Sequence, residues 1–436
     1  ISAVLAFVFT ILLFPTVRIL TGKVFAIQNL FAWDSMLIYI AVVLVTGILA
    51  GGYPAIILSG FKPMTVLRGS FRTSAQGSRL RQGLVILQFS LSIALMIGTA
   101  VVFSQLDYMQ TKQMGFQKEQ MLVIDFNHDQ VVTEHLNTIK NTFREQPEVL
   151  SVAASRSIPG SFFPNGGTVI ESSSGTMTSF VPAIFEVDAD FIDHFGLEMA
   201  AGRAYSTNFP ADSAFSLIIN EAAAKEYGYT DPEKIIGKKF HQWGRTGQVI
   251  GVVKDFNYLS LHDKVEPLAL RYEPASSRYL SLRLKSGNLR GTIAKIEKQW
   301  AALTPHRPFI YTFLDESFNR QYEANVRFRA LFAIFSGLAI LIACLGLLGL
   351  ATYTAQQRSK EIGIRKVLGA SVTQITTLLS KDFIKLVLIA ILIASPISWW
   401  VMNKWLQDFA YKIDIQWWMF ALAGFASVFI AVLTVS

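Results

Sequence analysis

Residues 330–354, ALFAIFSGLAILIACLGLLGLATYT, contain no charged side chain. An α-helix crosses the apolar core of a bilayer with about 20 residues, because each residue adds about 1.5 Å of length. An amphipathic helix of a soluble domain would instead carry polar side chains along one face. The stretch therefore predicts a helix that spans a membrane.

Five further stretches have a similar length and character. The chain is 52% hydrophobic and only 16% charged, whereas a soluble domain has about 25% charged residues. The six stretches form two groups of three, with a long charged insert between them. The sequence therefore predicts an α-helical transmembrane protein with an inserted α+β extracytoplasmic domain. The other five stretches are residues 1–20, 35–58, 83–104, 384–403 and 417–436.

The basic residues indicate the orientation of these helices. Within residues 105–328 acidic residues slightly outnumber basic ones. The net charge of +8 therefore comes from the rest of the chain. Short loops rich in Lys and Arg stay on the cytoplasmic side of a membrane. Residues 59–82 contain Lys62 and Arg68 and no acidic side chain, and residues 355–383 are also mainly basic. Both loops are therefore expected in the cytoplasm, which puts the insert outside.

This orientation divides the chain into segments of different character. The insert contains a middle part that is richer in Gly, Ser and Pro, and we expect an inserted subdomain at about residues 160–277. The segments are two transmembrane helices at 1–58, a basic cytoplasmic loop at 59–82, a helix at 83–104, the extracytoplasmic domain at 105–328, a helix at 329–354, a cytoplasmic loop at 355–383 and two helices at 384–436.

The insert shows the periodicities of both strands and helices. Residues 121–126 and 149–154 are apolar and strand-like, and apolar residues at helical spacing separate them. A similar unit recurs later, with alternating polar and apolar residues at 280–284, helical spacing at 293–303 and an extended stretch at 308–313. We expect these two units to pack together.

An internal repeat relates the first and last helices. Pro15 is followed eight residues later by Lys23, and Pro396 is followed eight residues later by Lys404. Phe25 and Phe409 then occupy similar places. Two helical pairs therefore resemble copies of each other, as in membrane proteins built from repeats. We expect the chain to be a fragment of a longer protein, containing the end of a first half and then a second half.

Motifs for catalysis or nucleotide binding are absent from the sequence. It lacks the G-x-x-x-x-G-K-[ST] phosphate loop, its histidines lack metal-site spacing, and Cys344 is its only cysteine. Asp188, Asp190 and Asp193 lie close in sequence, but we expect Asp190 to cap a short helix over residues 191–195, with Gly196 at its end. No catalytic, cofactor-binding or metal site is predicted in this chain.

The strongest local signal is QQRSKEIGIRKVLGAS, residues 356–371. Glu361 and Arg365 are four residues apart, which supports a helix. Gly369 is suited to end that helix, and Ser371 with Gln374 fits the capping box of a second helix. The pattern predicts a helix, a sharp turn and another helix. A simple solvated basic loop is the alternative that the residues themselves leave open.

The same phrase resembles the signature of the FtsX-like, or MacB-like, family of ABC transporter permeases. In that family a phrase of the type R-x-x-E-I-G, followed by L-G-A, leads into the next transmembrane helix. The layout of residues 83–436, with one helix, a large outer domain and three closing helices, is also similar to the family. Residues 53–69 resemble its closing helix and tail. The matching residues of the phrase are Arg358, Glu361, Ile362, Gly363, Leu368, Gly369 and Ala370.

This resemblance implies a permease subunit without enzymatic activity in a bacterial inner membrane. A separate cytoplasmic ATPase would bind ATP, and its work would move the periplasmic domain for export or for transmission of force. The other implied partners are the lipid bilayer and further envelope proteins, with no nucleic acid and no cofactor in this chain. The residues expected to couple to the ATPase are Arg358, Glu361, Ile364, Arg365, Leu368 and Gly369.

Two other functions remain open at this stage. A membrane-anchored sensor would relay an extracytoplasmic ligand signal to a cytoplasmic partner, and it would need a small apolar pocket in the insert. A membrane enzyme acting on a lipid or envelope substrate would need converging titratable residues in the insert.

Overall fold

The computed structural model describes residues 2–22, 26–59 and 75–435. Its contacts divide the chain into two units. The helical unit comprises Ile1–Asp107, Ala324–Leu406 and Ile413–Ser436, within the described ranges. The α+β domain comprises Tyr108–Glu323 together with Gln407–Lys412. The repeat positions Lys23 and Phe25, and the loop residues Lys62 and Arg68, lie outside the described residues.

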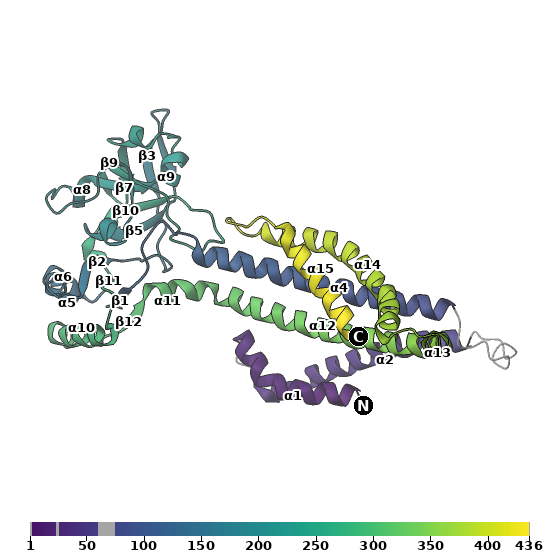
Figure 1. Ribbon diagram of the computed structural model, residues 1–436. Helices are drawn as coiled ribbons and strands as arrows, with labels where there is room; N and C mark the ends of the chain where they lie inside the picture. Colours follow the sequence, from purple (N-terminus) through teal and green to yellow (C-terminus); the bar gives the residue numbers. More distant parts are fainter. Residues whose placement is uncertain (1, 23–25, 60–74, 436) are drawn as a thin grey trace. The chain divides into compact units, whose positions relative to one another are not determined.

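All six expected apolar helices are present (Figure 1). Four contain segments long and apolar enough to cross a membrane. In the described parts of the other two, the apolar segments are shorter, Ser2–Arg18 and Trp33–Ile48. The six membrane crossings therefore stay a prediction. The helices are α1 (Ser2–Thr21), α2 (Trp33–Ser59), α4 (Ala75–Thr111), α12 (Glu323–Gln357), α14 (Val372–Leu406) and α15 (Trp417–Val435).

One mixed sheet forms the centre of the α+β domain (Figure 1). Its strand order is β12-β1-β11-β2-β5-β10-β7-β9-β8-β3-β4, with β6 paired to β9. The strands are β1 (Met121–Asp125), β2 (Val149–Ser155), β3 (Thr168–Glu171), β4 (Met177–Phe180), β5 (Ala183–Val187), β6 (Met199–Gly202), β7 (Ser216–Asn220), β8 (Lys239–Gln242), β9 (Arg245–Val253), β10 (Leu268–Tyr272), β11 (Tyr279–Leu284) and β12 (Tyr311–Phe313).

Seven helices lie between or after these strands in the described part of the domain. They are α5 (Gln130–Glu134), α6 (Leu136–Arg144), α7 (Phe191–His194), α8 (Asp212–Phe215), α9 (Glu221–Glu226), α10 (Leu289–Leu303) and α11 (Leu314–Asn319). Shorter 3-10 turns are η1 (Ile27–Phe31) in the helical unit and η3 (Pro232–Ile235), η4 (Pro274–Ser276) and η5 (Arg320–Tyr322) in the domain.

The two units predicted at the ends of the insert pack together in one half of the sheet. Strand β11 lies between β1 and β2 and pairs antiparallel with both, and β12 pairs with β1. The strand predictions are therefore confirmed, although β12 is shorter than the expected extended stretch. The predicted helix after β1 is divided into α5 and α6 at His135.

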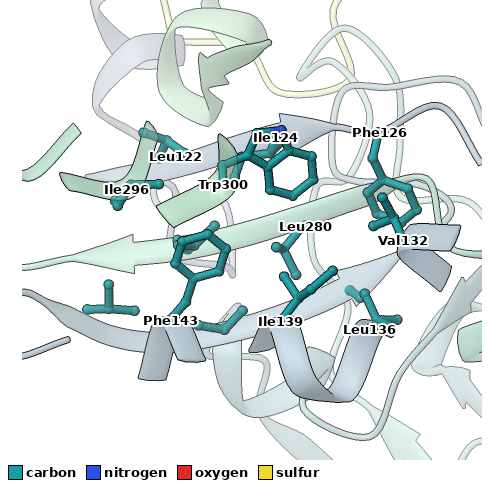
Figure 2. Packing of buried hydrophobic residues seen from close by; sticks show 14 of the residues in the cluster. Leu122, Ile124, Phe126, Val132, Leu136, Ile139, Phe143, Leu280, Ile296 and Trp300 are labelled. Carbon is teal, nitrogen blue, oxygen red and sulfur yellow. The ribbon is translucent and has the colours of Figure 1, made fainter. Parts of the chain in front are cut away.

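Alternating residues of these strands build the first core. Leu122 of β1, Val152 of β2 and Leu280 of β11 belong to one buried cluster with Phe143 of α6 and Trp300 of α10. Figure 2 shows the side chains of α6 projecting from the helix toward those of the sheet. Leu280, Leu282 and Leu284 of β11 all face this cluster, so the period of two read from the sequence identifies the buried face of that strand.

The other half of the sheet is formed by the middle of the insert. Its core gathers apolar residues of β7, β8 and β9 around α9, including Ile219, Phe240 and Val252. The two halves meet where β2 pairs with β5, through Ser155 opposite Val187.

One short segment of the domain comes from far along the chain. Residues Gln407–Lys412 connect α14 to α15 and pack within the domain unit. The ring of Phe409 stacks on that of His262 with centroids 4.5 Å apart, and the amide of Ala410 donates to the His262 carbonyl at 2.9 Å. The Lys112 ammonium lies 3.3 Å from the centroid of the Tyr411 ring. These contacts make the segment a tertiary element of the domain.

Candidate functional site

The predicted coupling residues all lie in the connection between α12 and α14. Helix α12 ends at Gln357, and a nine-residue helix, α13 (Ser359–Val367), follows it. The turn after α13 places Gly369 at φ +91°, a left-handed conformation that suits glycine. The amide of Ala370 donates to the Arg365 carbonyl at 2.9 Å, and that of Gly369 to the Lys366 carbonyl at 3.1 Å. These two bonds form a Schellman motif, which ends α13 at the predicted residue.

The next helix begins with the predicted capping box. The Ser371 hydroxyl accepts from the Gln374 amide at 3.2 Å, and the Gln374 side chain accepts from the Ser371 amide at 3.0 Å. Two backbone donors at the start of α14 are thereby satisfied. The helix, sharp turn and helix predicted from the sequence are confirmed.

Two ion pairs hold this connection in shape. Arg365 Nη2 lies 2.7 Å from Glu361 Oε1 within α13, and Arg358 Nη2 lies 3.2 Å from Asp382 Oδ2 on α14. All four side chains are about half exposed, and such pairs contribute about 0.5 kcal/mol or less. The charges therefore orient α13 more than they stabilise it, and they remain accessible to a partner.

An exposed apolar stripe runs along α13. Ile364, Val367 and Leu368 are 63%, 88% and 80% exposed, and no residue of α13 is buried. Residues three and four apart share one face of a helix, so these three side chains form a continuous strip. We call them the α13 stripe. Val367 was not among the predicted residues, although an apolar residue in a short charged helix was a signal for it.

The chemistry available at α13 is that of a docking surface. It combines the α13 stripe with the charges of Glu361, Arg365 and Lys366. Within residues 2–22, 26–59 and 75–435, no three His, Cys, Asp or Glu side chains gather as metal ligands would. The combination of apolar and charged side chains on α13 is suited to packing against another protein.

A buried ionic cluster lies in the α+β domain, where the sequence led us to expect a helix cap. Asp190 makes no side-chain hydrogen bond to the start of α7, so that prediction is wrong. Its Oδ2 instead lies 2.5 Å from both Lys140 Nζ and Arg144 Nη2 of α6. Asp188 accepts from the Asp190 amide at 3.1 Å and pairs with Lys140. Gly196 has φ +63° and ends the short helix as expected.

The two carboxyl groups of this cluster have opposite pKa shifts. Burial raises the pKa of Asp188, although the Lys140 ammonium lies against it. Burial acts to raise the pKa of Asp190 as well, but hydrogen bonds and positive charge from Lys140 and Arg144 outweigh it and hold this pKa below its usual value. A cavity of about 680 Å³ borders the cluster, lined mainly by polar side chains of α6 and of the loops around Asp190 and Tyr272.

His194 is buried beside this cluster. Its Nδ1 lies 2.9 Å from the Ser151 hydroxyl, and its Nε2 has no hydrogen-bond partner among the described residues. Burial, with the nearby positive charges of Lys140 and Arg283, lowers the pKa of His194 to about 3. The imidazole is therefore neutral in the folded domain at every pH between 7 and 4.

This neutrality predicts a pH-dependent loss of stability. Below pH 6.5 the unfolded chain binds a proton at His194 that the folded domain does not, so acidification favours unfolding. Between pH 7 and pH 5 this group alone should remove about 2 kcal/mol of stability. His194→Asn keeps a donor near Ser151 and should flatten the fall in hydrogen-exchange protection of β2 across this range. His135→Asn, at an exposed histidine, should leave the slope as in the parent; an equal slope in all three proteins would contradict the assignment.

Two solved structures resemble part of this chain. No curated protein matches the chain. The periplasmic region of MacB from Actinobacillus actinomycetemcomitans is 16% identical, with 49% of this chain and 97% of that chain covered and a TM-score of 0.35. The extracellular domain of the noncanonic ABC-type transporter YknZ from Gram-positive bacteria is 14% identical, with 44% and 97% covered and a TM-score of 0.31.

A family model covers the C-terminal part that contains α13. The FtsX-like permease C-terminal model matches residues 333–435, from within α12 to the end of α15. This range includes the Glu361 phrase, the turn at Gly369 and the helices on both sides of them. Over these residues the chain is similar to FtsX-like permeases.

Proposed function

We propose that this chain is the permease subunit of an ABC transporter, and that α13 is its docking element for a separate cytoplasmic ATPase. The ATPase would bind ATP, and its conformational change would pass through α12 and α14 to the α+β domain. The work would be export or transmission of force across the envelope. The chain itself would carry no catalytic site.

The observation that carries this proposal is the exposure of α13. A short helix rarely presents three large apolar side chains to solvent unless they pack against something else. The α13 stripe lies between charges of both signs, and the Schellman motif and capping box hold both ends of the turn. Apolar anchors surrounded by charged groups are typical of protein interfaces.

The proposal includes a membrane location and a division of the chain. We place residues 83–104, 329–354 and the two closing helices in the inner membrane of a Gram-negative bacterium, with residues 105–328 in the periplasm. Residues 160–277 would be an inserted subdomain there. Because Gln407–Lys412 packs within the domain unit, a movement of α14 or α15 would reach the domain through that segment as well as through α12.

A ligand sensor is an alternative function. It would need an apolar pocket in the α+β domain, whereas two cavities there, of about 530 and 680 Å³, are lined mainly by polar side chains. A sensor would also lack a stable ATPase partner. Co-purification of an ABC ATPase with the full-length protein therefore separates the two functions.

Exchanging the charges of α13 tests the docking role. In Glu361→Arg and Arg365→Glu like charges stand four residues apart, which should weaken α13 by only about 0.5 kcal/mol. The double exchange E361R/R365E again has opposite charges at that spacing. If the ATPase forms ion pairs with these side chains, all three variants should bind the ATPase at least about tenfold more weakly. The double exchange is included because it keeps the ion pair within α13 but reverses the charges that face the ATPase.

A matched exchange in the α+β domain serves as the control. Glu148 and Lys295 form an exposed ion pair there, and E148K/K295E should leave ATPase binding unchanged. Recovery of binding in E361R/R365E would mean that the pair only supports the helix. Unchanged binding in all α13 variants would overturn the proposed site.

A further inference from the structure

Helices α4 and α12 form an antiparallel pair within the helical unit. The Ser92 hydroxyl of α4 donates to the Ala339 carbonyl of α12 at 2.9 Å, and the guanidinium of Arg329 lies 4.4 Å from the centroid of the Phe103 ring. Toward the other end of the pair, Arg81 contacts Tyr353. As the position along α4 rises from 81 to 103, the partner on α12 falls from 353 to 329, so the pairing extends over most of both helices.

A groove opens between the two helices at the Arg81 end. It has a volume of about 430 Å³, and aliphatic side chains and two glycines form most of its lining. A Cβ added at Gly346 would meet Gln88 Oε1 at 2.4 Å, whereas one added at Gly349 would meet nothing within 4 Å. Gly349 therefore leaves open the space that a side chain would fill. The lining residues are Arg81, Leu84, Val85, Gln88, Gly346, Gly349, Leu350 and Tyr353.

A cation stands at the mouth of this groove. The Arg81 guanidinium lies 3.9 Å from the centroid of the Tyr353 ring, and its Nη2 donates to the Tyr353 hydroxyl at 3.2 Å. An arginine held against an aromatic ring keeps its charge and has its donors in a fixed plane. The groove is thus polar and cationic at one end and apolar beyond it.

We propose that this groove binds an anionic phospholipid of the cytoplasmic leaflet. The inference rests on the proposed function, which puts the Arg81 end of α4 at the cytoplasmic face. The phosphate would accept from Arg81, and the upper part of an acyl chain would lie on Leu84, Val85 and Leu350. Gln88 lies one turn beyond Leu84 and Val85 on α4, beside Gly346 at the other end of the groove.

The dimensions and charges favour a lipid over other ligands. From Tyr353 to Gly346 the groove follows α12 for about 10 Å, which matches a head group and the start of a chain. Leu84, on one wall, is 55% exposed, and a soluble phosphate would gain nothing from that apolar wall. Basic pockets between helices near the cytoplasmic face recognise anionic head groups in this way.

Native mass spectrometry of the full-length protein in mixed micelles tests the site. The probes are phosphatidylglycerol, which is anionic, and phosphatidylcholine, which is zwitterionic, with acyl chains of equal length. The parent protein should retain phosphatidylglycerol at least about fivefold more than phosphatidylcholine, and Arg81→Gln should remove this preference. Gly349→Leu should reduce retention of both lipids, because its side chain fills the groove.

Two matched variants separate the groove from general effects. Lys381→Gln removes an exposed cation in the third turn of α14, and Gly337→Leu adds the same side chain on α12 where nothing lies within 4 Å of a Cβ. Both should behave as the parent. Equal retention of the two lipids by the parent, or an unchanged preference in Arg81→Gln, would overturn the proposal. The proposal would also be overturned if Gly349→Leu retained lipid but no longer bound a second copy of the chain, since a helix of that copy would then occupy the groove.

ATPase co-purification from the same samples keeps the two proposals distinguishable. Arg81→Gln and Gly349→Leu leave α13 intact, so both should retain the ATPase while losing lipid. A variant that loses both the lipid preference and the ATPase would indicate unfolding. Unchanged hydrogen exchange of the R81Q variant excludes unfolding as the cause of its lost lipid preference.

Discussion

Replacing Lys140 with methionine is expected to destabilise the α+β domain by about 3–5 kcal/mol. Lys140 and Asp188 are each 4% exposed, and the lysine is the cation shared by Asp188 and Asp190. Methionine has a similar volume but no charge, so Asp188 would be left as a buried carboxylate without its counter-ion. The amides of Ala154 and Asp190 still donate to it, but they do not replace a full charge.

Hydrogen exchange of the full-length protein measures this effect locally. Protection of the β2 and β5 amides should fall by at least about 100-fold, because tenfold corresponds to about 1.4 kcal/mol. Lys295→Met is the matched control, since Lys295 pairs with Glu148 at the surface and should lose less than about 1 kcal/mol. The double variant K140M/D188N should recover part of the loss. A loss below 1 kcal/mol in Lys140→Met would show that the cluster does not stabilise the domain.

The parts of the structure that could be predicted are those whose signals are local. The turn at Gly369 and the cap at Ser371 depend on residues within four positions, and both are present as predicted. The strand and helix periodicities around Phe143 likewise identified the first core. Such features can be predicted from the sequence because the residues that determine their geometry are close together along the chain.

The sequence predictions failed where residues distant along the chain form contacts in place of a local hydrogen bond. Asp190 stands where a helix cap belongs, but α6 brings Lys140 and Arg144 to it from about 50 positions away. A charge-assisted bond to two cations is stronger than a cap to one amide. The packing of Phe409 on His262 is equally long-range and had no signal in the sequence. Val367 was overlooked, although its apolar side chain in a short charged helix was a signal for it.

If α13 docks an ATPase as proposed, aspartate at both Ile364 and Leu368 is expected to abolish stable binding of that ATPase. Burial of an Ile or Leu side chain at an interface contributes about 1.5–3 kcal/mol, and a buried carboxylate without a partner opposes binding further. With two anchors lost, the ATPase affinity should fall by at least about 1,000-fold. The fold should tolerate both changes, because these side chains are 63% and 80% exposed in the free subunit.

Comparison with another exposed apolar residue makes the result specific. Phe162 in the α+β domain is 82% exposed, and Phe162→Asp should leave ATPase binding unchanged. Binding is measured by co-purification and by ATP hydrolysis in the reconstituted complex, with hydrogen exchange of α12 and α14 as the check on folding. A double variant that still binds the ATPase would remove α13 from the interface. The proposed route through α12 and α14 would then lack a contact with the cytoplasmic partner.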